Sequence, residues 1–240
     1  ASAQDSGNTA VGITPITIEV GEFTFNGLTT GPEDGELVLL LHGFPQSSIE
    51  WRAQLSALGA TGYRAVAPDQ RGYSPDARPT DVEDYAYDLL VGDVLAMADV
   101  LGANTFHLVG HDWGGSVAWG VAVAAPDRVM TLSVFSVPHP LAFDNQLADT
   151  TSCQYAASAY FDFLNSPIAE SSILAGDAAI LRSFYDGVSA EAVDEYVELL
   201  GSEPALRAAI NWYRANLEGR RMVGRADDLV TVPTVYVWSD

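Results

Sequence analysis

The sequence has no lysine and a single cysteine, and it has no run of about 18 or more apolar residues. One cysteine excludes a disulfide framework and a thiolate-rich metal site. Without a long apolar run we expect no membrane-spanning helix and no membrane partner. Because 11 arginines stand against 32 acidic residues, the formal net charge is −21. Such a surface repels phosphate backbones, so nucleic acid is not an expected partner.

The N-terminal residues are small and polar, with neither the basic segment nor the apolar core of an uncleaved signal peptide. We therefore expect residues 1–15 to be flexible and the protein to be cytoplasmic. The rest of the 240 residues, with 48% hydrophobic and 18% charged residues overall, is typical of a chain that folds around one sizeable core. The sequence indicates no particular oligomeric state.

Short apolar segments alternate with amphipathic segments through the first half of the chain. Leu37 to Leu41 is a continuous apolar run, as expected for a strand buried on both faces. The alternation predicts an α/β fold with a mostly parallel sheet and right-handed crossovers. The expected strands are 16–20, 23–25, 37–41, 64–68, 105–109, 129–137 and 234–238, and the expected helices are 51–58, 85–101 and 113–125.

The pattern changes at Pro138. From there to about Arg225 we expect helical segments only, with many aromatic residues, before the final strand at 234–238. An all-helical block between two strands of a parallel sheet predicts a lid. We expect residues 16–138 and 226–240 to form the core and residues 139–225 to form a helical cap.

The segment Gly110-His111-Asp112-Trp113-Gly114-Gly115 follows a buried strand and opens a helix. That is the setting of a nucleophile elbow, a turn so tight that the positions two before and two after the nucleophile must be very small. Gly110 and Gly114 meet this need, and Asp112 stands at the nucleophile position. A carboxylate cannot usefully attack an ester, but it can displace at an sp³ carbon and form an alkyl-enzyme ester. The alternative is a glycine-rich turn whose aspartate caps the helix.

A second motif, His42-Gly43-Phe44-Pro45, comes directly after the strand at 37–41. In the architecture that an elbow predicts, this loop supplies one backbone N–H of an oxyanion hole, and the residue after the nucleophile supplies the other. These N–H groups would belong to Phe44 and Trp113, with His42 holding the loop. A turn that merely ends the strand is the alternative explanation for this motif.

These two motifs and a third, Pro68-Asp69-Gln70-Arg71-Gly72-Tyr73-Ser74, carry a family resemblance. From Leu37 to Asp240 the chain resembles the α/β-hydrolase superfamily, in particular its aspartate-nucleophile branch of soluble epoxide hydrolases and haloalkane dehalogenases. The resemblance implies an inserted helical cap, a small neutral apolar substrate, and neither a metal nor another cofactor. Substrate contacts are expected from His42, Pro45, His139 and Trp212, although for His139 we favour a hinge role at the start of the cap.

Epoxide hydrolases place two cap tyrosines over the nucleophile, and their hydroxyls bind the epoxide oxygen and protonate it as the ring opens. The segment Asn211-Trp212-Tyr213-Arg214 is similar to the one that carries the second tyrosine, so the resemblance implies this role for Tyr213. Tyr160, seven residues before Pro167, resembles the first. An opening epoxide develops alkoxide charge that a positioned phenol can stabilise and protonate. The alternative is that both tyrosines only pack the cap.

The epoxide hydrolase hypothesis, with a vicinal diol as product, has rivals. A haloalkane dehalogenase would hold halide with the Trp113 indole and a second side-chain donor, where this chain has Phe44. A fluoroacetate-type dehalogenase has an arginine at the position of Trp113. A non-catalytic member of the fold would bind a small apolar ligand without turnover. A serine-type esterase is disfavoured because the elbow holds no serine.

The triad order in these hydrolases is nucleophile, acid, histidine. The acid would follow the strand at 234–238, and Asp240 stands slightly too early for that role. We expect the acid, the histidine and the last strand and helix on a C-terminal segment that these 240 residues do not contain. The alternative is a truncated and impaired enzyme that lacks the catalytic histidine. The 240 residues alone are then expected to form the ester on Asp112 but not to hydrolyse it.

Overall fold

The computed structural model describes residues 12–218, 221–222 and 229–238. Within them, a seven-stranded sheet has the order β1-β2-β4-β3-β5-β6-β9. Pairings from β4 through β3, β5 and β6 to β9 are parallel, whereas β1, β2 and β4 pair antiparallel. The predicted mostly parallel sheet is confirmed. The strands are β1 Thr14–Val20, β2 Phe23–Thr30, β3 Leu37–Leu41, β4 Arg64–Pro68, β5 Phe106–His111, β6 Val129–Phe135 and β9 Thr234–Val237.

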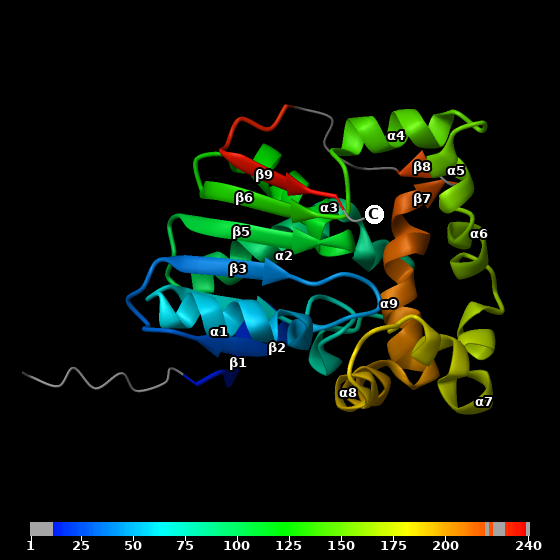
Figure 1. Ribbon diagram of the computed structural model, residues 1–240, viewed down its shortest axis with the longest axis horizontal. Coiled ribbons are helices and arrows are strands. Elements are labelled where there is room, and N and C mark those ends of the chain that lie inside the picture. Colours follow the sequence, from blue (N-terminus) through cyan, green and yellow to red (C-terminus); the bar gives the residue numbers. More distant parts are fainter. Residues whose placement is uncertain (1–11, 219–220, 223–228, 239–240) are drawn as a thin grey trace, which may run out of the picture.

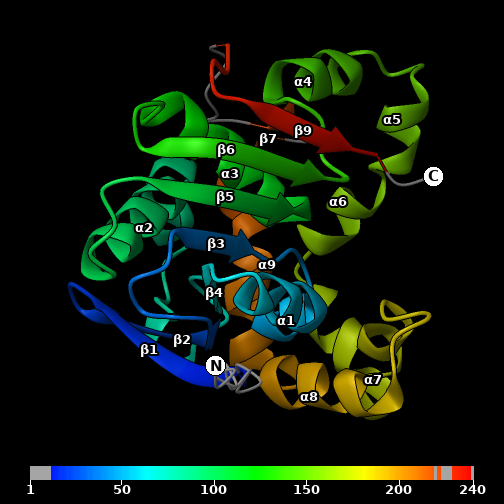
Figure 2. The ribbon, with the colours of Figure 1, turned by 60° about the vertical axis from the view of Figure 1, so that its left-hand side comes forward.

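Helices cover both faces of the sheet (Figure 2). The apolar run of β3 explains the arrangement, because alternate side chains of a strand point to opposite faces. Val38 and Leu40 pack with Leu55 of α1, whereas Leu39 and Leu41 belong to the larger core that includes α2 and α3. The helical elements of this part are η1 Ser48–Trp51, α1 Arg52–Ala60, η2 Pro75–Ala77, η3 Val82–Tyr85, α2 Tyr87–Val100 and α3 Asp112–Ala124.

The helices that follow β6 gather beside the carboxyl ends of the parallel strands (Figure 1). We call residues 140–216 the helical block. Its inner helix, α9, lies nearest the sheet and buries Trp212 and Tyr213. The helices are α4 Pro140–Ala148, α5 Cys153–Ala157, α6 Tyr160–Leu164, α7 Ala169–Ser183, α8 Ala190–Leu200 and α9 Glu203–Asn216.

The prediction of helix alone after Pro138 is wrong at one place. β7 (Leu217–Glu218) and β8 (Arg221–Met222) form a small antiparallel pair after α9. The backbone of Leu217 is already extended, and strands of two residues are too short to show an alternating pattern. The predicted end of the cap near Arg225 lies outside the described residues.

Hydrogen bonds fix the helical block to the α/β part of the molecule. The Trp212 indole N–H donates to the carbonyl oxygen of Arg71 at 2.8 Å, and the Tyr185 hydroxyl donates to that of Pro45 at 2.7 Å. Arg52 of α1 donates to both carboxylate oxygens of Glu195 on α8, at 2.8 and 2.6 Å. Because two of these contacts end on the predicted motifs, the block is held in register with the loops of the candidate site.

The two ends of the described chain differ from the expectations in detail. β1 begins at Thr14, which pairs with Thr29, so two of the residues predicted to be flexible belong to the sheet. β9 confirms the last predicted strand, and its four residues are exposed. Asp240 lies outside the described residues. In the part of the chain that is described, no helix is both long and apolar enough to cross a membrane.

Candidate active site

Asp112 stands where β5 meets α3, with a backbone φ of +49°. Residues other than glycine rarely adopt this left-handed conformation, so close packing must hold it. A Cβ atom at Gly110 would lie 2.4 Å from the carbonyl oxygen of Gly114, and one at Gly114 would lie 2.2 Å from that of Leu41. Only glycine fits at either position, which is the geometry that the elbow predicts.

The carboxylate of Asp112 contacts the loop after β3 rather than capping its own helix. His111 is the N-cap of α3, and Asp112 is its first helical residue. The backbone N–H of Phe44 donates to Oδ1 of Asp112 at 2.9 Å. Trp113 lies in the first turn of the helix, where backbone N–H groups have no partner within the helix. Of the two residues predicted to form the oxyanion hole, Phe44 therefore donates to the carboxylate and Trp113 follows it directly in the chain.

His42 lies beneath this loop and is completely buried. Its Nε2 accepts the backbone N–H of Gln70 at 3.1 Å, so its Nδ1 carries the proton and donates to the carbonyl oxygen of Gly43 at 3.0 Å. Burial lowers the pKa of His42 to about 4, which keeps the ring neutral. The predicted substrate contact of His42 is wrong because both ring nitrogens are engaged inside the protein, and the residue holds the loop instead.

Two further predicted substrate contacts need correction. Trp212 is 1% exposed. Its indole N–H donates to the carbonyl oxygen of Arg71 and its ring packs edge-on against Trp113, so it holds Trp113 in place without facing a cavity. His139 accepts the N–H of Leu141 at the start of α4 and lines a different cavity, and its hinge role stays a prediction. Neither lines a cavity that reaches Asp112.

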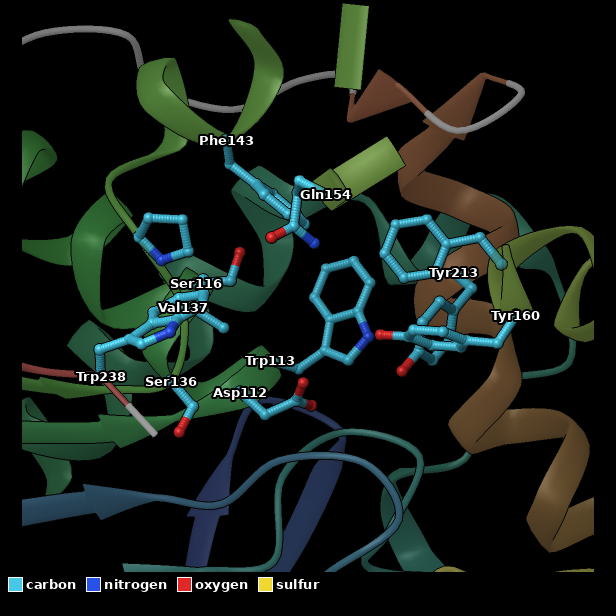
Figure 3. Close-up of a pocket in the computed structure, with 12 residues that line it drawn as sticks. Asp112, Trp113, Ser116, Ser136, Val137, Phe143, Gln154, Tyr160, Tyr213 and Trp238 are labelled. Carbon is cyan, nitrogen blue, oxygen red and sulfur yellow. The ribbon is translucent and has the colours of Figure 1, made fainter. Parts of the chain in front are cut away.

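Two cavities meet at Asp112, Tyr160 and Tyr213. Figure 3 shows the smaller one, with these side chains converging on it from the elbow and from the helical block. In the described part of the chain, no histidine lines either cavity. The larger, of about 550 Å³, is lined by Phe44, Pro45, Gln46, Asp112, Tyr160, Phe163, Leu164, Ile180, Phe184 and Tyr213. The smaller, of about 100 Å³, is lined by Asp112, Trp113, Ser116, Ser136, Val137, Pro138, Phe143, Gln154, Tyr160, Phe161, Tyr213 and Trp238.

The two tyrosines differ in exposure but share their surroundings. Tyr213 is 2% exposed and packs edge-on against Trp113 and Phe44, with ring centroids 5.1 and 5.3 Å apart. Tyr160 is 47% exposed as a residue, yet its hydroxyl hydrogen-bonds with Tyr213 inside the cavity. Burial, and secondarily the Asp112 carboxylate and the other phenol, raise the pKa of Tyr213 well above 10. Burial and then Asp112 raise the pKa of Tyr160, so both are proton donors at neutral pH.

A histidine–glutamate pair that no motif indicated lies next to the nucleophile. Nδ1 of His111 is 2.6 Å from Oε1 of Glu50, which belongs to η1. Burial works against a charged imidazole here, but the contact with Glu50 and the nearby Asp112 outweigh it and raise the pKa of His111. The pair connects the elbow to the segment that follows the Phe44 loop. Because 61 positions separate Glu50 from His111, no sequence pattern could have indicated the contact.

This pair predicts a pH-dependent effect of Glu50→Gln on stability. A group whose pKa is higher in the folded than in the unfolded state stabilises the fold by binding its proton more tightly there. For His111 this stabilisation is complete below the unfolded-state pKa of 6.5, and it is lost as the pH rises through the folded-state pKa. We therefore expect Glu50→Gln to lower the thermal midpoint at about pH 6 and to lower it less at about pH 9. Glu198→Gln, at an exposed position of α8, serves as the control. A deficit of equal size at both pH values would contradict the assignment.

Ser116, Gln154 and Phe184 line the cavities without having been indicated by any motif. Ser116 lies one turn beyond Asp112 on α3, so helical periodicity is the one sequence signal that could have suggested it. Gln154 and Phe184 reach the site only through the packing of the helical block. Among the described residues, no group of three or more histidine, cysteine, aspartate or glutamate side chains could hold a metal ion.

Comparison with known proteins bears on this geometry. The model of the alpha/beta hydrolase family matches residues 38–240. The AB hydrolase superfamily protein YfhM of Bacillus subtilis is 33% identical over 226 residues, 89% of this chain and 78% of its own length. Epoxide hydrolase 3 of Xenopus tropicalis is 34% identical over 228 residues, 90% of this chain.

The structural comparison agrees with the sequence comparison. A solved structure of an epoxide hydrolase from Bacillus megaterium in complex with an inhibitor superposes with a TM-score of 0.84 at 26% identity. The match covers 93% of this chain and 82% of that one. The chain spans 61% of the length of the Xenopus relative, so the match covers part of that protein only.

Proposed function

This chain belongs to the alpha/beta hydrolase family, and from that premise we propose that it opens epoxides to vicinal diols through an ester on Asp112. The observation that carries the proposal is the position of Tyr160 and Tyr213, which line both cavities that meet at the Asp112 carboxylate. A nucleophile opposite two proton donors is what ring opening requires. The helical block would serve as the cap, and the substrate would be small, neutral and mainly apolar.

The first step is a displacement at carbon. Because the N–H of Phe44 holds Oδ1 of Asp112, Oδ2 is the oxygen that would attack an epoxide carbon. The new C–O bond forms as the ring C–O bond breaks, and the electron pair moves to the epoxide oxygen. That oxygen takes a proton from Tyr160 or Tyr213, whose raised pKa values keep them protonated until this moment. The product of the step is a β-hydroxyalkyl ester of Asp112.

The second step is hydrolysis of that ester. Water would attack the carboxyl carbon of Asp112, and the negative charge on its oxygen would be stabilised by the N–H groups of Phe44 and Trp113. The hydrolysis needs a base, and in the described part of the chain no histidine lines the cavities. We therefore assign only the first step to the residues that line these cavities.

The contacts of Trp113 favour the epoxide over a halide. Its side chain hydrogen-bonds with Tyr213, which engages the indole N–H that a dehalogenase would direct at the halide. A fluoroacetate-type site is disfavoured as well, because no arginine lines either cavity within the described chain. A ligand-binding protein without turnover would need neither the strained nucleophile nor the paired phenols.

Trapping of the ester tests the proposal. Incubation with a terminal aryl epoxide should raise the intact mass of the protein by the mass of one epoxide, and proteolysis should locate the addition on the peptide that contains Asp112. Incubation with a chloroalkane and an assay for released halide provide the control for dehalogenation. No mass increase and no diol with a panel of epoxides would contradict the proposal.

A further inference from the structure

We propose that the site selects unsymmetrical epoxides that carry a short substituent ending in a hydroxyl on one carbon and a long apolar substituent on the other. This inference rests on the proposed function and specifies its substrate class. It follows from a difference between the two cavities that meet at Asp112. The oxirane ring would lie at the carboxylate, with one substituent in each cavity.

The larger cavity is apolar along most of its wall. Its volume of about 550 Å³ is several times that of the other. Besides Asp112 and the two tyrosine hydroxyls, its lining has one polar side chain, that of Gln46, whose buried amide oxygen lacks a hydrogen-bond partner among the described residues. Burial of an apolar group there is favourable because it removes apolar surface from water. Ile180 and Phe184 are partly exposed at this cavity, so an extended substituent can reach toward solvent between them. The apolar side chains of its wall are Phe44, Pro45, Phe163, Leu164, Ile180 and Phe184.

The smaller cavity, of about 100 Å³, contains an unsatisfied hydroxyl. Ser116 is 3% exposed, and its Oγ has no hydrogen-bond partner among the described residues. Buried polar groups normally have partners, and in a space this small a substituent that fills the cavity must either supply the missing bond or leave the hydroxyl unpaired. Gln154 lines the same space, and its amide nitrogen donates to Ser158 at 3.1 Å, which leaves its amide oxygen to accept.

The geometry favours a hydroxyl on the substrate. Ser116 and Gln154 line the same small cavity, and Figure 3 draws both on the other side of the Trp113 ring from Tyr160. A hydroxyl can donate to one of these groups and accept from the other, whereas a methyl group would leave Ser116 buried and unpaired. The small volume limits this substituent to a few atoms. A bulky or wholly apolar group would therefore be directed to the larger cavity.

A matched pair of substrates tests the inference. The first is an oxirane with a pentyl group on one carbon and a hydroxymethyl group on the other, and the second has methyl in place of hydroxymethyl. The measured quantity is the second-order rate constant for formation of the Asp112 adduct, followed by intact mass after acid quenching. For the wild-type chain we expect the alcohol to react about tenfold faster, the effect of one hydrogen bond.

Three variants separate this preference from intrinsic reactivity. Ser116→Ala should bring the ratio of the two rate constants down about tenfold, because the hydroxyl loses its partner. Alanine is well tolerated inside a helix, so this variant should fold. Ser171→Ala, at an exposed position of α7, should keep the wild-type ratio. Ile180→Trp should slow both pentyl substrates without changing their ratio, because it narrows the other cavity.

The outcomes distinguish the inference from the function on which it rests. An adduct with both substrates, with a ratio that Ser116→Ala does not change, would overturn the preference while supporting the epoxide chemistry. A ratio that falls equally in Ser171→Ala would also overturn it. No adduct with either substrate would overturn the proposed function, and the preference with it.

Discussion

Asp112→Asn should abolish the covalent adduct and slow epoxide consumption by at least about 10³-fold, the scale on which nucleophile replacements act. An amide has the shape of the carboxylate and can still accept the N–H of Phe44, but it is a poor nucleophile at carbon. The measurement is intact mass and substrate loss after incubation with a terminal aryl epoxide. The loss should appear in the rate of the chemical step rather than in substrate binding. The substrate is neutral, so loss of the Asp112 charge changes its affinity little, and the amide is the same size as the carboxylate.

Folding should not limit this test. The backbone at position 112 has a φ of +49°, and asparagine is among the residues that tolerate this region best. We therefore expect a thermal midpoint no lower than that of the wild type. Asp88→Asn, at an exposed position of α2, is the matched control and should leave the adduct intact. An adduct of undiminished yield in Asp112→Asn would show that another carboxylate is the nucleophile.

The elbow could be predicted from sequence because all its requirements are local. A buried strand, a carboxylate, a helix and glycines at fixed offsets lie within a few consecutive residues, and the structure adds the close approaches that make Gly110 and Gly114 necessary. The contact of Phe44 with Asp112 spans 68 positions, yet the order of the parallel strands β3 and β5 fixes it. Loops at the carboxyl ends of neighbouring parallel strands must meet, so this part of the site also follows from the fold.

The parts that could not be predicted depend on which side of an element packs inward. His42 directly follows β3, beside the loop that contacts Asp112. Its position in the sequence is equally compatible with a ring that faces the substrate and with one that faces the core. The ring faces the core because the backbone N–H of Gln70 donates to its Nε2, a contact that forms only when the chain folds. Trp212 and Tyr213 are neighbours on α9, and only the packing of that helix directs the first to Arg71 and the second to the cavity.

Double replacement of the cavity phenols, Tyr160→Phe with Tyr213→Phe, should slow adduct formation by about 10³-fold or more, since a single general acid contributes about 10² to 10⁴. Each single variant should show a smaller loss, because the remaining phenol still protonates the epoxide oxygen. We expect the larger single effect from Tyr213→Phe, whose hydroxyl is fully buried and held by Trp113. The measurement is the rate constant of adduct formation at saturating epoxide. Tyr63→Phe serves as the control, because Tyr63 packs against His107 and lines neither cavity.

The pH dependence identifies the chemistry behind that loss. Because burial raises the pKa values of both phenols above 10, wild-type adduct formation should not decline between about pH 7 and pH 9, where ordinary phenols also stay protonated.

If the tyrosines only packed the helical block, the double variant would lose thermal stability in proportion to its loss of rate, and the loss would be equal for every electrophile. A proton donor predicts otherwise: alkylation of Asp112 by an alkyl sulfonate, whose leaving group needs no proton, should be far less sensitive than alkylation by an epoxide. Equal sensitivity to the two electrophiles would contradict the role of the phenols as acids.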